Sequence, residues 1–96
     1  MLLKMVSLLE IPDTDYWFDV GCDEARRYLD SDDRVLHLLT EKWGELSLLA
    51  QEHLAYILGE GHSENELLII NEMLKSGSKE IVFRAQEALI EFKRGT

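Results

Sequence analysis

The chain has 96 residues, of which 46% are apolar, so we expect one small domain with a modest hydrophobic core. It contains 19 acidic and 10 basic residues, and its formal net charge is −9. Such a charge repels nucleic acid and anionic membranes and attracts basic proteins. We therefore expect a basic protein partner, with no binding to nucleic acid or membrane.

Cysteine usage and the N-terminus indicate a soluble protein of the cytoplasm. Cys22 is the only cysteine, which excludes an internal disulfide. The apolar stretch 1–11 lacks the small-residue cleavage site of a signal peptide and is predicted to form a helix of the mature protein. No apolar run approaches the roughly 20 residues that cross a bilayer.

The pattern of helix-forming and helix-breaking residues predicts an all-α domain over 1–96. Helices are expected near 1–10 and 16–29, separated by a turn at 12–14, and together they form a degenerate N-terminal pair over 1–30. Acidic and serine residues at 31–33 open the next helix. No alternation of apolar and polar residues predicts a strand, so we expect five or six helices, stacked as antiparallel pairs.

The helix at 45–58, which ends at Gly59, is nearly apolar all round. A helix without a wide polar face is normally buried between neighbours, so we expect it at the centre of the domain. The next helix begins with a predicted capping box, in which the Ser63 hydroxyl accepts from a free amide and Glu66 reaches back to the Ser63 amide. Ser78 is predicted to cap the last helix.

Residues 46–54 resemble residues 81–89 at an offset of 35 positions. The same offset places Leu39 on Leu74, so it covers a helix pair and predicts two repeat units, 31–59 and 63–94. A period of roughly 20–50 residues is typical of stacked solenoids. Such proteins present extended surfaces to partners.

The second unit resembles a HEAT-like helical repeat of the type found in PBS lyases. It has a leucine-rich first helix over 66–74, a short polar turn and a second helix over 81–89. The second helix matches the family pattern at four positions: Ile81, Ala85, Ala88 and Leu89. Val82 departs from the usual arginine, and residues 31–59 match more loosely. The resemblance implies a short solenoid that binds proteins and carries no catalytic residues.

The sequence offers no pattern of an enzyme, a metal site or a cofactor site. The three histidines fall on different predicted elements and lack the i, i+4 spacing of a helical zinc site: His37, His53 and His62. Neither a G-x-G-x-x-G motif nor a P-loop is present. The aspartates near Gly21 do not follow the spacing of an EF-hand loop. We therefore expect no catalysis, no metal and no cofactor.

The strongest candidate site is the acidic stretch from Asp13 to Asp33, which holds eight of the 19 acidic residues. Concentrated like charge destabilises a fold, so a partner is expected to make use of it. Carboxylates around an aromatic anchor suit a site lined by lysine and arginine. The candidate partner-binding residues are Asp13, Asp15, Tyr16, Trp17, Asp19, Asp23, Glu24, Asp30, Asp32 and Asp33.

Two other interpretations stay open. The acids can be helix caps and a solvated face, while the aromatic residues close the end of the core. The binding surface can also be a concave helix face that includes four polar residues: Gln51, Glu52, Gln86 and Glu87.

If the acidic stretch from Asp13 to Asp33 is helical, Asp15, Asp19 and Asp23 form one acidic stripe at i+4 steps.

These features favour a binding protein over a catalyst. Our leading hypothesis is an immunity protein or antitoxin that neutralises a basic toxin, such as a nuclease, by occluding its active site. The overall form resembles the small helical immunity proteins of contact-dependent inhibition systems. The alternative is a HEAT-like adaptor or assembly module that holds a helix or peptide on its concave face. A HEAT-like lyase subunit or DNA glycosylase is a third hypothesis, and the charge of −9 argues against the glycosylase.

Overall fold

The computed structural model describes residues 2–61 and 63–94. The elements are, in chain order, α1 (Leu2–Leu9), α2 (Thr14–Tyr16), η1 (Trp17–Gly21), α3 (Cys22–Ser31), α4 (Asp33–Lys42), η2 (Trp43–Glu45), α5 (Leu48–Ile57), α6 (Glu64–Met73) and α7 (Lys79–Arg94). Element η1 is a π-helical turn and η2 a 3₁₀ turn. These residues include no strand, which confirms the prediction of an all-α fold.

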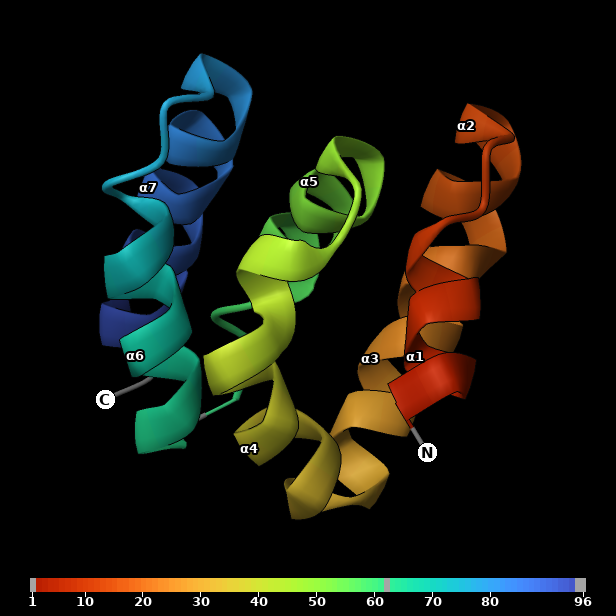
Figure 1. Cartoon of the computed structure of the whole chain (residues 1–96), viewed down its shortest axis with the longest axis horizontal. Coiled ribbons are helices and arrows are strands. Elements are labelled where there is room, and N and C mark those ends of the chain that lie inside the picture. Colours follow the sequence, from red (N-terminus) through yellow and green to blue (C-terminus); the bar gives the residue numbers. More distant parts are fainter. Residues whose placement is uncertain (1, 62, 95–96) are drawn as a thin grey trace.

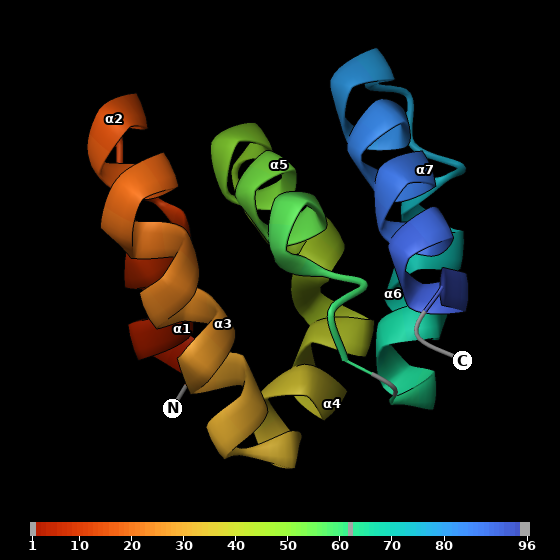
Figure 2. The ribbon, with the colours of Figure 1, turned by 180° about the vertical axis from the view of Figure 1, so that it is seen from behind.

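The helices form two layers. Helix α4 contacts α1 and α3 on one side and α6 on the other, and α5 likewise contacts α3 and α7. Figure 1 shows α1, α4 and α6 on the near side, and Figure 2 shows α3, α5 and α7 side by side from behind. Helix α5 therefore has neighbours on both flanks, as its apolar sequence predicted.

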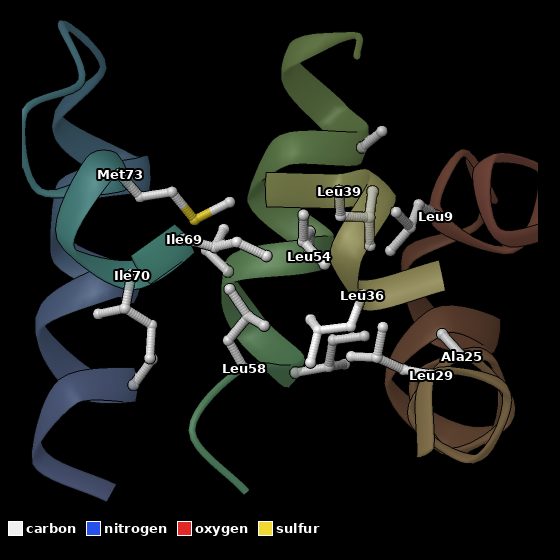
Figure 3. Close-up of a cluster of buried hydrophobic side chains, with 14 of the residues drawn as sticks. Leu9, Ala25, Leu29, Leu36, Leu39, Leu54, Leu58, Ile69, Ile70 and Met73 are labelled. Carbon is white, nitrogen blue, oxygen red and sulfur yellow. The ribbon is translucent and has the colours of Figure 1, made fainter. Parts of the chain in front are cut away.

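The core lies between the two layers. Figure 3 shows a row of buried side chains that runs from α1 and α3 through α4 and α5 to α6. Leu39 and Leu54 are fully buried at its centre. The remaining fully buried residues of large volume are Met5, Leu9, Trp17, Ile57, Leu58, Ile69, Ile70, Met73, Ile81 and Glu66. Glu66 is the one ionisable residue in this set.

The two helix pairs α4–α5 and α6–α7 correspond at an offset of 31 positions, because α4 begins at Asp33 and α6 at Glu64, while α5 begins at Leu48 and α7 at Lys79. The caps fix the same offset. Ser47 Oγ accepts from the N–H three residues on at 3.2 Å, and Ser78 Oγ does the same at 3.4 Å. The predicted offset of 35 is therefore wrong by one helical turn.

A continuous helical segment runs through α2, η1 and α3, and it turns by a π-helical step at Trp17–Gly21. Gly21 allows close packing here, because a Cβ at this position would lie 2.9 Å from Ile11 Cδ1 and 3.0 Å from Trp17 Cε3. The π turn holds more residues per turn than an α-helix, so side chains four positions apart do not stay in line across it.

Glu66 has a different role from the predicted one. Ser63 does cap α6, since its Oγ accepts from the Asn65 N–H at 3.1 Å. The Glu66 carboxylate, however, lies in the interior and accepts from the Arg26 guanidinium and from the Gly59 N–H. The second half of the predicted capping box is therefore wrong, and Glu66 instead joins α6 to α3 and to the end of α5.

Candidate partner-binding site

The acidic stretch lies along α2, η1, α3 and the start of α4. All its carboxylate residues are exposed except Asp32, which is partly buried. Three of them hold local structure. Asp13 accepts from the Tyr16 N–H at 3.1 Å, and Asp32 caps α4 by accepting from the Arg34 N–H at 3.0 Å. Asp30 pairs with Arg26 at 2.6 Å. The interpretation of these acids as caps thus holds for Asp13 and Asp32.

Trp17 lies in the core and not at the surface. Its side chain is fully buried, and its ring stacks on His53 with centroids 4.0 Å apart and planes 10° apart. Its Nε1 has no hydrogen-bond partner among the described residues. The expectation of a surface anchor at Trp17 is therefore wrong, because the ring closes the core between η1 and α5. Tyr16 and Phe18 are 46% and 43% exposed.

The face formed by α3, α5 and α7 is hollowed by two adjacent cavities. The larger has a volume of about 340 Å³ and is lined by Cys22, Asp23, Tyr56, Ile57, Leu58, Glu60, Arg84, Glu87, Ala88 and Glu91. The smaller has a volume of about 210 Å³ and is lined by Thr14, Trp17, Phe18, Leu49, Glu52, His53, Tyr56, Glu80 and Arg84. Tyr56 and Arg84 line both, and we call the two cavities together the α5 groove.

Contacts between side chains cross the groove from one wall to the other. The Phe18 ring meets the Tyr56 ring edge to face, with centroids 5.1 Å apart. The Arg84 guanidinium carbon lies 5.3 Å from the centre of the Tyr56 ring, a cation–π arrangement. Arg84 Nε also donates to a Glu80 carboxylate oxygen at 3.0 Å. These contacts link η1, α5 and α7 across the middle of the groove.

The α5 groove is strongly acidic. Its lining includes six carboxylates and a single guanidinium, that of Arg84; the carboxylates belong to Asp23, Glu52, Glu60, Glu80, Glu87 and Glu91. Glu91 also pairs with Arg94 at 3.4 Å. Within the part of the chain that the structure describes, Asp23, Glu60 and Glu87 have no ion-pair partner. Negative charge with low-dielectric walls attracts cations into such a groove.

The structure does not gather the predicted site residues in one place. Only Asp23 and Trp17 line the α5 groove, and Asp15 and Asp19 lie outside it. The π turn between them accounts for the broken stripe. Glu24 lies elsewhere, beside Lys4, Leu8, Arg27 and Tyr28 in a hollow between α1 and α3.

The four residues of the alternative surface do not lie together. Glu52 and Glu87 line the groove, whereas Gln51 is buried and its amide donates to the carbonyls of Gly44 and Leu46. Sequence reasoning missed Glu80 and Glu91 as groove residues. Their spacing with Glu87 along one face of a helix was a usable signal.

Two side chains that line the groove, those of Cys22 and His53, have shifted pKa values. Burial, together with the nearby charge of Asp23, raises the pKa of the Cys22 thiol, which disfavours the nucleophilic thiolate. His53 Nδ1 lies 2.7 Å from the Leu9 carbonyl oxygen, to which it donates. Burial lowers the pKa of His53. In residues 2–61 and 63–94, which exclude His62, no group of three or more histidine, cysteine or acidic residues is arranged to hold a metal ion.

No known protein family, no curated protein and no solved structure matches this chain. None of the helices in the described residues has the length and apolar character needed to cross a membrane.

Proposed function

We propose that this chain is a non-catalytic, acidic protein-binding module whose partner is a basic protein. The observation that carries the proposal is the charge of the α5 groove, where six carboxylates meet one guanidinium. Opposite charge steers association and fixes the orientation of the partner. Exposed aromatic groups between the carboxylates, such as Tyr56 at 41% exposure, supply the apolar contact that charge alone lacks.

The form of this function that we favour is an immunity protein or antitoxin of the cytoplasm that neutralises a basic toxin such as a nuclease. Size, acidity and the lack of a catalytic pattern support it, together with the HEAT-like resemblance. The mechanism is occlusion: carboxylates pair with the cationic groups that hold the phosphates of the toxin's substrate. The substrate is then excluded because those groups are no longer free.

A HEAT-like adaptor or assembly module is the second candidate. The observation that favours it is the elongated groove between α3 and α7, which suits a helix or peptide of the partner. The two candidates differ in consequence, since an immunity protein abolishes its partner's activity and an adaptor preserves it.

The test is affinity capture from the source cell, identification of the captured protein, and reconstitution of the complex from the purified components. The proposal expects a basic protein whose binding weakens as salt rises, because exposed charges are screened over about 10 Å at 0.1 M salt. The immunity form further expects loss of the partner's activity in the complex, and a toxin gene beside the gene for this chain. A neutral or acidic partner, or affinity independent of salt, contradicts the proposal.

A further inference from the structure

The α5 groove has the length of a short helix. Its α7 wall is formed by Glu80, Arg84, Glu87 and Glu91, spaced i, i+4, i+7 and i+11, which is one face of a helix. At 1.5 Å per residue this wall extends about 16 Å, or three helical turns. Figure 2 shows α3, α5 and α7 side by side along this face, with α5 in the middle. A single helix of similar length can lie over α5, with α7 on one side and the segment from α2 to the start of α3 on the other.

The α7 wall of the groove and the middle of the groove differ in polarity. The α7 wall is acidic, whereas the middle of the groove exposes three apolar or aromatic side chains: Phe18 at 43%, Leu49 at 39% and Tyr56 at 41%. These three come from two elements and line the same cavity. A partner that matches both features presents apolar side chains toward α5 and basic side chains toward α7. That is the pattern of a basic amphipathic helix.

Arg84 shows how a cation is held in this groove. Its guanidinium lies over Tyr56 and pairs with Glu80, so a cation already lies where the two cavities meet. Arg84 is paired with Glu80, so Asp23, Glu60 and Glu87 line the larger cavity without an ion-pair partner among the described residues. An arginine or lysine side chain entering that cavity meets carboxylates from α3, from the loop after α5, and from α7.

We propose that the α5 groove is the docking site for a basic amphipathic helix of the partner. One arginine or lysine of that helix occupies the cavity between Asp23, Glu60 and Glu87. The proposal rests on the proposed function and specifies its surface and its ligand. It also assigns a role to Arg84, whose charge repels the incoming cation and therefore limits the affinity of the groove for basic helices.

The test uses a fluorescein-labelled amphipathic peptide of about four helical turns, with arginine and leucine on opposite faces. The same peptide with glutamate in place of arginine is the control ligand. Glu60→Gln and Glu87→Gln are each expected to weaken binding about twofold to fivefold, the range of partly solvated ion pairs. Arg84→Gln is expected to strengthen binding by a similar factor. A loss of folded protein cannot produce this opposite effect.

Asp15→Asn and Asp33→Asn are the matched controls, because each removes one exposed charge outside the groove. They are expected to change the affinity less than the groove variants do. Equal effects at the control and groove positions overturn the proposal, as do weaker binding by Arg84→Gln, equal binding of the glutamate peptide, and a failure of the arginine peptide to saturate.

The same variants, measured with the captured partner, separate the two proposals. If a basic partner binds with salt-dependent affinity but responds only to Asp15→Asn and Asp33→Asn, the proposed function stands and the docking site is wrong. If the captured partner is not basic, the proposed function fails whatever the peptide does.

Discussion

Arg26 and Glu66, 40 positions apart, meet in the interior through two hydrogen bonds, from Nη1 to Oε1 at 2.7 Å and from Nη2 to Oε2 at 2.9 Å. Arg26 Nη1 also donates to the Ile57 carbonyl at 3.0 Å, and Glu66 Oε1 accepts from the Gly59 N–H at 3.1 Å. The side chains are only 10% and 2% exposed. The pair therefore joins α3, the end of α5 and the start of α6.

Removal of either member of this pair is expected to destabilise the fold strongly. Glu66→Leu leaves the Arg26 charge buried with only Asp30 beside it, and Arg26→Met leaves the Glu66 charge without its cation. We expect each to lower the free energy of unfolding by about 3–5 kcal/mol in urea titrations. The double variant is expected to lose less than the sum. Additive losses, or single losses below about 1 kcal/mol, contradict the role assigned to the pair.

Gly59 is expected to resist substitution for two reasons. Its φ of +99° lies in the left-handed region, and a Cβ there would meet the backbone of Ala88 on α7. We expect Gly59→Ala to lower the free energy of unfolding by about 1–3 kcal/mol. Gly77→Ala is the control, since a Cβ there meets nothing within 4 Å and φ is not positive. A loss of the same size in both variants would show that the close approach of Gly59 to α7 is unimportant.

Trp17 is expected to behave as a core residue. Trp17→Ala removes a fully buried ring and its stacking on His53, and we expect a loss of about 3–5 kcal/mol in stability. Tyr16→Ala, at an exposed neighbour, is expected to stay within about 0.5 kcal/mol of the wild type. Thermal unfolding measures both. Retained stability in Trp17→Ala together with lost partner affinity would restore Trp17 as a binding anchor.

His53 is expected to make stability depend on pH. Burial lowers its pKa in the folded protein below the ordinary 6.5, so the unfolded chain binds the proton more readily. Its contribution to stability is therefore complete above about pH 6.5 and falls as the pH drops below that value. We expect the free energy of unfolding to decrease between about pH 7 and pH 5, and His53→Gln to flatten this decrease.

A second acid-sensitive group lies outside that window. Hydrogen bonds from Arg34 lower the pKa of Asp32 below its ordinary 3.8, so its contribution is lost only in stronger acid. If the free energy of unfolding of His53→Gln depends on pH as that of the wild type does, a group other than His53 causes the predicted loss of stability on acidification.

The helices could be predicted from the sequence because their caps and apolar faces are local signals. Ser63 and Ser78 cap the helices that they were predicted to cap. The repeat offset was predicted wrongly because apolar faces recur at each turn, so an alignment shifted by four residues still matches face to face. The caps distinguish the two registers, since they mark where a helix begins.

The proposed binding surface was only partly predictable. Asp23 lines the groove and was predicted. Glu80, Glu87 and Glu91 lie near the other end of the chain, and only folding brings them into the same groove as Asp23. Glu66 fits a capping box in sequence, and only the fold brings Arg26 to it. Likewise, the sequence marks Trp17 as an aromatic residue among acids but carries no local signal for its stacking on His53.

We propose that carboxylates of the α5 groove bind a basic partner. This proposal is tested most directly by the dissociation constant of the captured partner for the wild type, for Glu60→Gln/Glu87→Gln, and for Asp15→Asn/Asp33→Asn. Both double variants reduce the net charge by the same amount. We predict that the groove variant binds more weakly than either single variant, by at most the roughly 25-fold product of two independent effects, with a shallower salt dependence. Equal affinities for the two double variants would contradict this proposal.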